Sequence, residues 1–332
     1  MTAKPLVSVI LPVKNCGEYL PEAVDSVLGQ TFRDLEIILV DDHSTDGSVQ
    51  ALGRDDARLK IFSNPGEGLV DALNAAAAIS SGELLARMDG DDVSEPSRIA
   101  RQVELMDGDK DIGVSGCLVE VVADAGVGEG YRAYESWINS LVSREDIERE
   151  IFVESPLPHP TTMIRRGVFR RLGGYRDMGW PEDYDLWLRA YEAGVGMAKV
   201  PEVLLKWRDW PKRVSKTCAR YSRESFMSAR AHFLKRTKLK NRAAVIWGAG
   251  KTGGLLCKRL RDEGAEVAGF IDINPRKIGK MKSGAPVIGP EAAGSVDELI
   301  LVAVASRGAR DAIRAFLNSK GKREGESYLC AV

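Results

Sequence analysis

The stretch LLARMDGDD, residues 84–92, is an apolar run that ends abruptly in a cluster of aspartates. The run predicts a strand over Leu84–Met88, and Gly90 permits a tight turn directly after it. Carboxylates at Asp89 and Asp91, two positions apart on such a turn, can point into one site and hold Mg²⁺ or Mn²⁺. The alternative interpretation is a solvated acidic turn that caps the next helix.

A second pair of aspartates follows another apolar run upstream. Leu35–Val40 predicts a buried strand that leads directly into Asp41 and Asp42. A carboxylate in this place can accept the imide N–H of a uracil or bond to a ribose hydroxyl. The alternative is that Asp42 or Ser44 caps the helix expected next.

The surrounding sequence alternates between helical and strand patterns. Besides these two strands, it predicts strands at Val7–Pro12, Leu59–Phe62 and Ile112–Val122, helices at Gly17–Leu28, Val49–Leu52, Leu69–Ile79, Tyr131–Phe152 and Tyr184–Ala193, and a turn region at Gly167–Tyr175. Short connections between alternating elements indicate an α/β fold with a mostly parallel sheet covered by helices on both faces. Ligands of such sheets bind at the carboxyl ends of the strands, where both aspartate clusters fall.

Composition limits the class of protein. A chain of 332 residues, 44% hydrophobic and 29% charged, is expected to form two compact globular units. A net charge of −1 argues against a dedicated nucleic-acid binder, so no nucleic-acid partner is expected. The five cysteines are scattered and never form a C-x-x-C pair. This pattern predicts reduced thiols and excludes both a disulfide framework and a thiolate metal site.

We expect a cytoplasmic protein. The apolar run near the N-terminus is too short for a signal peptide, and no stretch approaches the roughly 18 apolar residues of a membrane span. Lys206–Arg242 nevertheless contains 13 Lys or Arg against two acids, a local charge of +11. This segment is either a solvated connector helix or a surface that docks on an anionic membrane, at the inner membrane face.

Residues 5–215 resemble glycosyltransferase family 2, the inverting enzymes with the GT-A fold. The matching blocks are VSVILPVKNCGEYLPEAVDSVLGQTF from Val7, LEIILVDDHSTDGS from Leu35, GLVDALNAAAAISSGELLARMDGDDVSEPSRIARQVELM from Gly68, HPTTMIRRGVFRRLGGYRD from His159 and PEDYDLWLRA from Pro181. Together these motifs are highly specific. The resemblance implies transfer of a sugar from a nucleotide-sugar donor, with a divalent metal as cofactor.

The resemblance also assigns roles to single residues. It implies that Pro12 and Asp42 contact the nucleoside with Asp41 beside them, that Asp89 lies near the ribose and the metal, and that Asp91 is a metal ligand. Glu182 and Asp183 match the family's acidic pair, in which the second residue is the catalytic base. The alternative for this pair is an N-terminal helix cap. Weaker candidates for contacting the acceptor or diphosphate are Trp180, Arg208 and His159, although a lone tryptophan or loop histidine is often structural.

A separate motif follows the basic segment. Gly248, Gly250 and Gly253 form G-x-G-x-x-G between a predicted strand and a predicted helix, and Asp272 ends the next strand. In this context the backbone N–H groups of the loop bind phosphate and the acid binds a ribose. The sequence therefore predicts a GT-A-type domain at 1–215, a basic helical connector at 216–242 and a small Rossmann-like domain at 243–332. That domain either binds a nucleotide or serves a structural role.

Three functions are compatible with these patterns. The first is an inverting glycosyltransferase that moves a sugar, most simply from a UDP-sugar, to a sugar, lipid-linked or protein acceptor in polysaccharide or glycoconjugate synthesis. The second is an NAD-linked oxidoreductase, which only the C-terminal glycines suggest. The third is a non-catalytic nucleotide-sugar-binding protein. The acidic pair Glu182–Asp183 favours the first, because a binding protein needs no base.

Overall fold

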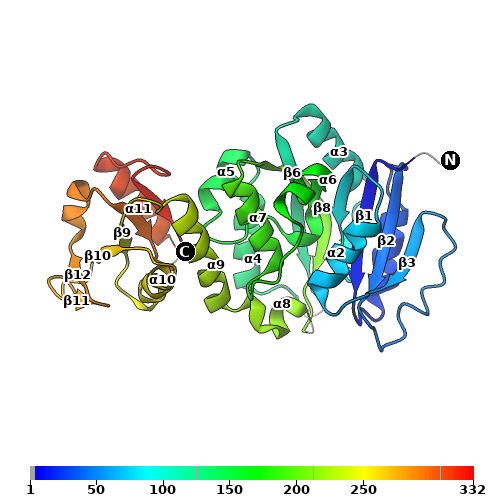
Figure 1. Cartoon of the computed structure of the whole chain (residues 1–332), viewed down its shortest axis with the longest axis horizontal. Coiled ribbons are helices and arrows are strands. Elements are labelled where there is room, and N and C mark those ends of the chain that lie inside the picture. The colour runs from blue at the N-terminus through cyan, green and yellow to red at the C-terminus, as the bar shows by residue number, and fades with distance from the viewer. Residues whose placement is uncertain (1–3, 124–125, 212, 307) are drawn as a thin grey trace. The chain divides into compact units, whose positions relative to one another are not determined.

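The computed structural model describes residues 4–123, 126–211, 213–306 and 308–332 (Figure 1). Contacts divide the chain into two compact units. The first consists of residues 1–147, 156–178 and 185–217, and the second of residues 148–155, 179–184 and 218–332. Among the described residues, none of the helices has both the length and the apolar character that crossing a membrane requires.

The first unit contains an eight-stranded sheet in the order β3-β2-β1-β4-β7-β6-β8-β5. Its strands are β1 (Val7–Val13), β2 (Leu35–Asp41), β3 (Leu59–Ser63), β4 (Leu84–Arg87), β5 (Val93–Ser94), β6 (Ile112–Val122), β7 (Met163–Arg165) and β8 (Gly196–Arg208). The four strands from β3 to β4 run parallel, and β7 pairs antiparallel with both β4 and β6. The predicted α/β class is confirmed, with a mixed sheet beyond β4.

Helices cover both faces of this sheet because its central strands are apolar on both sides. All seven residues of β1 are buried. Its odd-numbered side chains, from Val7 to Val13, share one core with α1 (Tyr19–Leu28) and α3 (Arg98–Gly108). The helix α2 (Leu69–Ile79) also packs against β1 and β2, but its residues lie outside that core. Burial of each Val, Leu or Ile side chain contributes about 1.5–3 kcal/mol to the free energy of unfolding.

Several elements differ from the sequence-based prediction, which also lacked the short strands β5 and β7. Residues 49–52 form a turn instead of a short helix, and the helix predicted over Tyr131–Phe152 is two helices, α4 (Glu129–Ser140) and α5 (Arg144–Glu150). The predicted turn region after Gly167 contains α6 (Arg166–Leu172), which ends at Gly173 in the left-handed conformation.

The longest element that the prediction omitted is β8, which includes the start of the basic segment at Lys206. Pro201 concealed it, because proline cannot donate to a ladder. The register of β8 against β6 shifts at this point, from Val200 opposite Cys117 to Val203 opposite Leu118. A bulge therefore accommodates the proline within a long strand.

The second unit contains a smaller sheet in the order β11-β12-β10-β9-β13-β14. Its strands are β9 (Ala244–Trp247), β10 (Val267–Ile271), β11 (Met281–Lys282), β12 (Ala285–Ile288), β13 (Leu299–Val302) and β14 (Tyr328–Cys330). All pairings are parallel except that of the edge strand β11 with β12. Its helices include α9 (Arg223–Thr237), α10 (Lys251–Asp262) and α11 (Ala309–Ser319). The strand order reverses between β9 and β13, which creates the position where such sheets bind ligands.

Candidate active site

The two aspartate clusters lie at the ends of β2 and β4, the two strands that flank β1. β1 pairs in parallel with β2 on one side, where Val13 lies opposite Asp41, and with β4 on the other, where Ile10 lies opposite Arg87. The backbone N–H of Asp42 donates to the Val13 carbonyl over 2.7 Å. The sheet thus places both clusters at its carboxyl edge.

Three carboxylates gather in the cluster that follows β4. One oxygen from each of Asp89, Asp91 and Asp92 lies within 4.8 Å of the others. Gly90 is required in this turn, since a Cβ there would lie only 2.8 Å from the Cys16 sulfur. Sequence reasoning had assigned no role to Asp92, although its position in the motif was visible.

The electrostatics of this cluster suit a divalent cation. Burial, followed by the negative charge of Asp89, raises the pKa of Asp91, and the same two causes raise the pKa of Asp92 well above its ordinary value. Asp92 Oδ2 is buried without a hydrogen-bond partner in the structure. The buried Arg87 pairs with Asp89 and compensates only part of the charge. Mg²⁺ and Mn²⁺ prefer oxygen ligands, and a bound cation would offset the repulsion between these carboxylates. The residues present therefore fit the predicted metal.

Cys16 does not add a thiolate to this donor set. Burial, and then the charge of Asp91, raises the pKa of the Cys16 thiol to about 12. The thiol therefore stays protonated at neutral pH, and the donors of the cluster are carboxylate oxygens.

The end of β8 reaches the same cluster. The Arg208 backbone N–H donates to Asp92 Oδ1 over 2.8 Å, and Arg208 Nε donates to the Asp91 carbonyl, also over 2.8 Å. The guanidinium stacks 4.3 Å from the centre of the Tyr19 ring and pairs with Glu22. Arg208, a weak candidate from sequence, thus lies beside the carboxylates. Lys212, a further basic residue close to Arg208 in the sequence, lies outside the described residues.

Trp210 is a site residue that sequence reasoning missed. Its indole Nε1 donates to Asp91 Oδ2 over 2.5 Å, and its ring packs edge-on against Tyr19 at 5.6 Å. The hydrogen bond occupies one of the two oxygens that Asp91 can offer to a cation. Its N–H therefore competes with a metal for that oxygen.

We expect Trp210→Phe to strengthen cation binding in the absence of donor. Phenylalanine keeps the packing on Tyr19 and removes the N–H, and a hydrogen bond to a charged group is worth about 1.5–3 kcal/mol. Mn²⁺ affinity, measured by calorimetry, should rise by about 10-fold or more. Trp207→Phe is the matched control, because Trp207 packs against Tyr134. Equal Mn²⁺ affinity in Trp210→Phe and the wild type would contradict this role.

Asp42 is tightly held among the loops at the donor edge. It is 3% exposed, its Oδ1 accepts from Asn64 Nδ2 (2.7 Å) and the Gly68 N–H (2.8 Å), and its Oδ2 pairs with Lys14 at 2.9 Å. Burial opposes ionisation, but these donors outweigh it and lower the pKa of Asp42. An ionised Asp42 therefore holds two other loops, the one after β1 and the one between β3 and α2, at the carboxyl end of β2.

The two residues beside Asp42 in the donor prediction lie at the same edge. Pro12 is buried in β1 opposite Val40 of β2, and Asp41 Oδ1 accepts from the Ser44 N–H over 3.0 Å. The polar atoms of Asp41 and Asp42 thus already order the turn that would face a donor.

His159, a weak candidate, is buried in the first unit. It is 7% exposed, and its Nε2 lies 2.8 Å from the Tyr175 hydroxyl. Burial, and then the positive charge of Arg87, lowers the pKa of His159 well below its usual range. A neutral imidazole in this place orders the Tyr175 loop. It has no positive charge with which to bind a diphosphate.

The acidic pair begins α7 (Glu182–Glu192), and its two members differ. Glu182 is 1% exposed, with both carboxylate oxygens 2.9 Å from the Tyr221 hydroxyl and Arg220 at 3.5 Å. Asp183 is only partly buried, and its Oδ1 accepts from the Tyr184 N–H over 2.7 Å. Of the pair, Asp183 has the carboxylate that solvent reaches. Nearby in the chain, Trp180 is 8% exposed and packs on His232 at 5.5 Å, which is a packing role.

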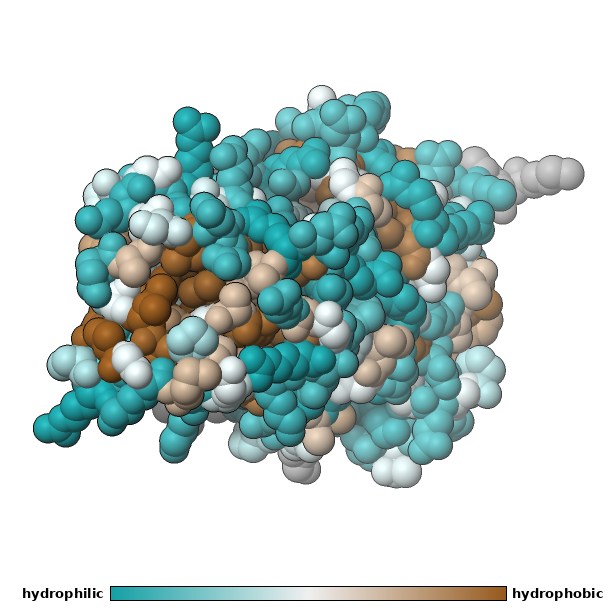
Figure 2. Space-filling view, turned by 60° about the vertical axis from the view of Figure 1, so that its left-hand side comes forward, coloured by the Kyte–Doolittle hydropathy of each residue, from teal (hydrophilic) through white to brown (hydrophobic). Residues whose placement is uncertain are grey.

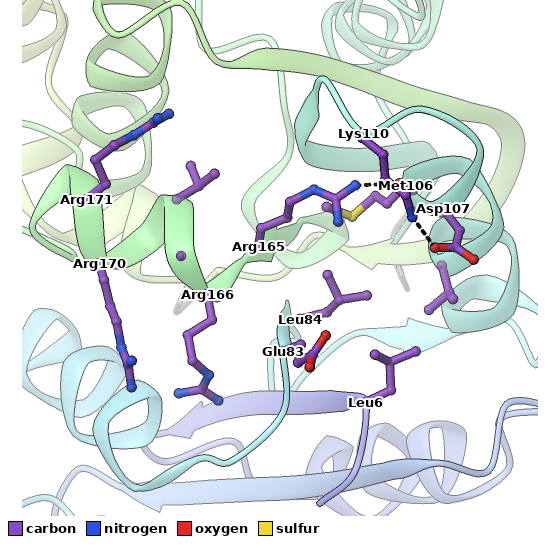
Figure 3. Close-up of a pocket in the computed structure, with 13 residues that line it drawn as sticks. Leu6, Glu83, Leu84, Met106, Asp107, Lys110, Arg165, Arg166, Arg170 and Arg171 are labelled. Carbon is purple, nitrogen blue, oxygen red and sulfur yellow. Dashed lines mark hydrogen bonds and ion pairs between the residues drawn. The ribbon is translucent and has the colours of Figure 1, made fainter.

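A basic hollow of about 600 Å³ lies at the opposite edge of the first sheet (Figure 3). Leu84, the first residue of β4, lines it, so it is at the far end of that strand from Asp89. Arg165 donates to the Met106 carbonyl near the end of α3 and to the Ile112 carbonyl at the start of β6. Arg166 donates to the carbonyls of Ala77 and Gly82 near the end of α2. These two arginines cap helices, and the hollow is separate from the aspartate site.

Comparisons with known proteins agree with this geometry. A family model described as glycosyl transferase family 2 matches residues 8–173. An uncharacterized glycosyltransferase of Haemophilus influenzae is 32% identical over 61% of this chain, which spans 65% of that relative, a little under two thirds of its length. The O-antigen biosynthesis glycosyltransferase WbnJ of Escherichia coli is 28% identical over 68% of this chain and 90% of its own.

Among solved structures, residues 1–349 of Staphylococcus aureus TarS in complex with UDP-GlcNAc have a similar fold. The TM-score is 0.58 at 21% identity, covering 78% of this chain and 72% of that chain. At this identity the likeness concerns the fold alone.

Proposed function

The chain belongs to glycosyl transferase family 2, and from this membership we propose that it is an inverting, metal-dependent enzyme that transfers a sugar from a nucleotide-diphosphate donor to an acceptor hydroxyl. The observation that carries the proposal is the cluster of Asp89, Asp91 and Asp92 at the carboxyl edge of the sheet. The donor is a UDP-sugar, as in the complex of TarS, and the product belongs to a surface polysaccharide or glycoconjugate, as the name of WbnJ suggests.

The donor side of the site is assigned to the first unit. Pro12, Asp41 and Asp42 hold the nucleoside, with Asp42 already fixed in its ionised form by Lys14 and the Gly68 N–H. Asp89 and Asp91 would hold Mn²⁺ or Mg²⁺, and Asp92 is a further candidate ligand. When bound, the cation offsets the charge that develops on the departing diphosphate. Arg208, next to these carboxylates, supplies a fixed positive charge for the same group.

The acceptor side is assigned to the start of α7. Asp183 takes the proton of the acceptor hydroxyl while the hydroxyl oxygen forms a bond to the anomeric carbon. The bond from that carbon to the diphosphate oxygen breaks, and the electron pair leaves with the nucleoside diphosphate. Glu182 keeps Asp183 in place through Tyr221 and Arg220, so we assign it a positioning role. His159 orders the Tyr175 loop through its hydrogen bond, and Trp180 packs on His232.

Thermal melting tests this function against the two alternatives. UDP with Mn²⁺ should raise the melting temperature more than UDP with EDTA, because the cation should tighten the binding of UDP. A ligand at 100 times its Kd adds about 2.7 kcal/mol to the free energy of unfolding. Stabilisation by NAD alone would favour an oxidoreductase. UDP binding without any release of nucleoside diphosphate from nucleotide sugars would favour a binding protein.

The basic segment extends the proposal to a membrane surface. Lys206–Arg242 has a formal charge of +11, of which Arg208, Arg220 and Arg230 are already paired with glutamates. The remaining excess of positive charge would attract anionic lipid, and a peripheral position at the inner membrane face would bring a cytoplasmic enzyme to a lipid-linked acceptor. Sedimentation with vesicles should show binding that increases with the anionic lipid fraction and falls with salt. Equal sedimentation with neutral and anionic vesicles would remove this part of the proposal.

A further inference from the structure

The second unit contains a cavity that the proposed function does not use. It measures about 880 Å³ and lies where the order of the smaller sheet reverses, between Trp247 at the end of β9 and Ala303 after β13. Figure 2, which brings the left-hand side of Figure 1 forward, shows an apolar area on that side with hydrophilic residues around it. The volume is that of a typical small-molecule site.

One part of the cavity is built to face an anion. Gly250 is the N-cap of α10, and a Cβ added to it would meet nothing within 4 Å, so the end of the helix is open to the cavity. The N–H groups of the first turn have no acceptor within the helix and carry its positive dipole end. Lys251 and Lys277 line the cavity, and the Arg223 guanidinium donates to the Thr252 hydroxyl in the same turn.

The glycine loop is held rigidly above this part. A Cβ on Gly253 would lie 1.9 Å from the Gly248 carbonyl, so only glycine allows the helix to pack against the loop. Asp272, which sequence reasoning assigned to a ribose, is 7% exposed. It accepts from the Ala249 N–H over 2.9 Å and pairs with Lys277 at 2.8 Å. These donors outweigh burial and lower the pKa of Asp272. Asp272 therefore positions the loop.

The other part of the cavity is apolar. Trp247 and Phe316 meet there edge-on at 5.6 Å, and Val304, Ala312 and Ile313 complete the wall. Ser306 is the only hydroxyl of this half among the described lining residues. Apolar and aromatic walls of this kind accommodate a nucleobase better than a sugar, because a sugar would leave its hydroxyls without hydrogen-bond partners.

We propose that this cavity is a second nucleotide site that binds a nucleoside diphosphate unit. The diphosphate lies at the start of α10, near Lys251 and Arg223, and the base lies in the apolar half beside Phe316. Free nucleoside diphosphates, nucleotide sugars and dinucleotides all contain this unit.

The test is calorimetry on the full chain with the first site silenced. Asp91→Asn in EDTA removes metal-dependent binding, and the probes are UDP, ADP, UDP-GlcNAc and NAD. Binding of at least one probe is expected. If UDP-GlcNAc binds and NAD does not, the natural ligand is a nucleotide sugar. If NAD binds and UDP-GlcNAc does not, the natural ligand is a dinucleotide. If none of the four probes binds, the proposal is overturned. The proposed transferase function would still stand, because it is tested separately by the metal-dependent reaction of the wild type.

Gly250→Asp locates the site. Aspartate is a favourable N-cap, and the backbone at φ −89° accepts it, so the melting temperature should not fall. Its charge would stand where the diphosphate binds and should weaken binding by about 30-fold or more. Lys251→Glu, on the exposed side of the same turn, should act in the same direction.

Gly128→Asp is the matched control. Gly128 is the N-cap of α4 and is equally open, so the same substitution should leave binding unchanged. Unaltered affinity in both Gly250→Asp and Lys251→Glu would place the nucleotide elsewhere and overturn the proposal.

Discussion

Replacing Asp183 with asparagine is expected to abolish sugar transfer while leaving donor binding intact. A positioned general base contributes about 10²–10⁴ in rate, and an amide cannot accept the acceptor's proton. The substitution should be tolerated, because the amide oxygen can still accept from the Tyr184 N–H. The loss should appear in kcat for transfer, with an unchanged Kd for UDP in the presence of Mn²⁺.

Two other variants separate this base from a general effect of charge. Glu192→Gln, at the other end of α7, should retain full activity. Glu182→Gln keeps an acceptor for the Tyr221 hydroxyl and should lose far less activity than Asp183→Asn. Undiminished transfer by Asp183→Asn would refute the role assigned to this carboxylate.

Replacing Asp91 with asparagine is expected to remove metal-dependent donor binding and to lower transfer by about 10³-fold or more. The estimate corresponds to several kcal/mol of charge stabilisation on the leaving diphosphate. Calorimetry should show no increase in UDP affinity on addition of Mn²⁺. Asp107→Asn, on the surface of α3, is the control and should behave like the wild type.

The same variant should be more stable than the wild type in the absence of metal. Because the pKa of Asp91 is raised in the folded protein, folding favours its protonated form. The free energy of unfolding must then fall as pH rises from the ordinary pKa of an aspartate towards the folded one. Asparagine removes this loss, so the melting temperature at neutral pH should rise while activity disappears. A lower melting temperature would show that Asp91 mainly supports the fold.

The sequence predicted most accurately those elements whose pattern is local. α2 and β6 have the predicted bounds, because an alanine-rich periodicity and a long apolar run each identify one element. The sequence also predicted that Asp42, Asp89 and Asp91 lie at one edge of the sheet, because parallel neighbouring strands end at the same edge. By contrast, the interrupted strand β8 was invisible, since Pro201 lies within it.

The contacts that the sequence did not reveal join distant parts of the chain. Trp210 reaches Asp91 across 119 positions, and Arg208 reaches Asp92 across 116. No periodicity encodes such pairs, since they depend on β5 pairing with the end of β8. Similarly, only the structure shows that Asp272 is already occupied by Lys277 and the Ala249 N–H.

Release of nucleoside diphosphate from a panel of nucleotide sugars is the most direct measurement of the central claim. The wild-type chain should release it from at least one UDP-sugar with Mn²⁺ or Mg²⁺, and faster with a hydroxyl acceptor present. Release should stop in EDTA and in Asp91→Asn. Release at an equal rate in EDTA, or by Asp91→Asn with Mn²⁺, would contradict a metal-dependent transferase centred on the aspartate cluster.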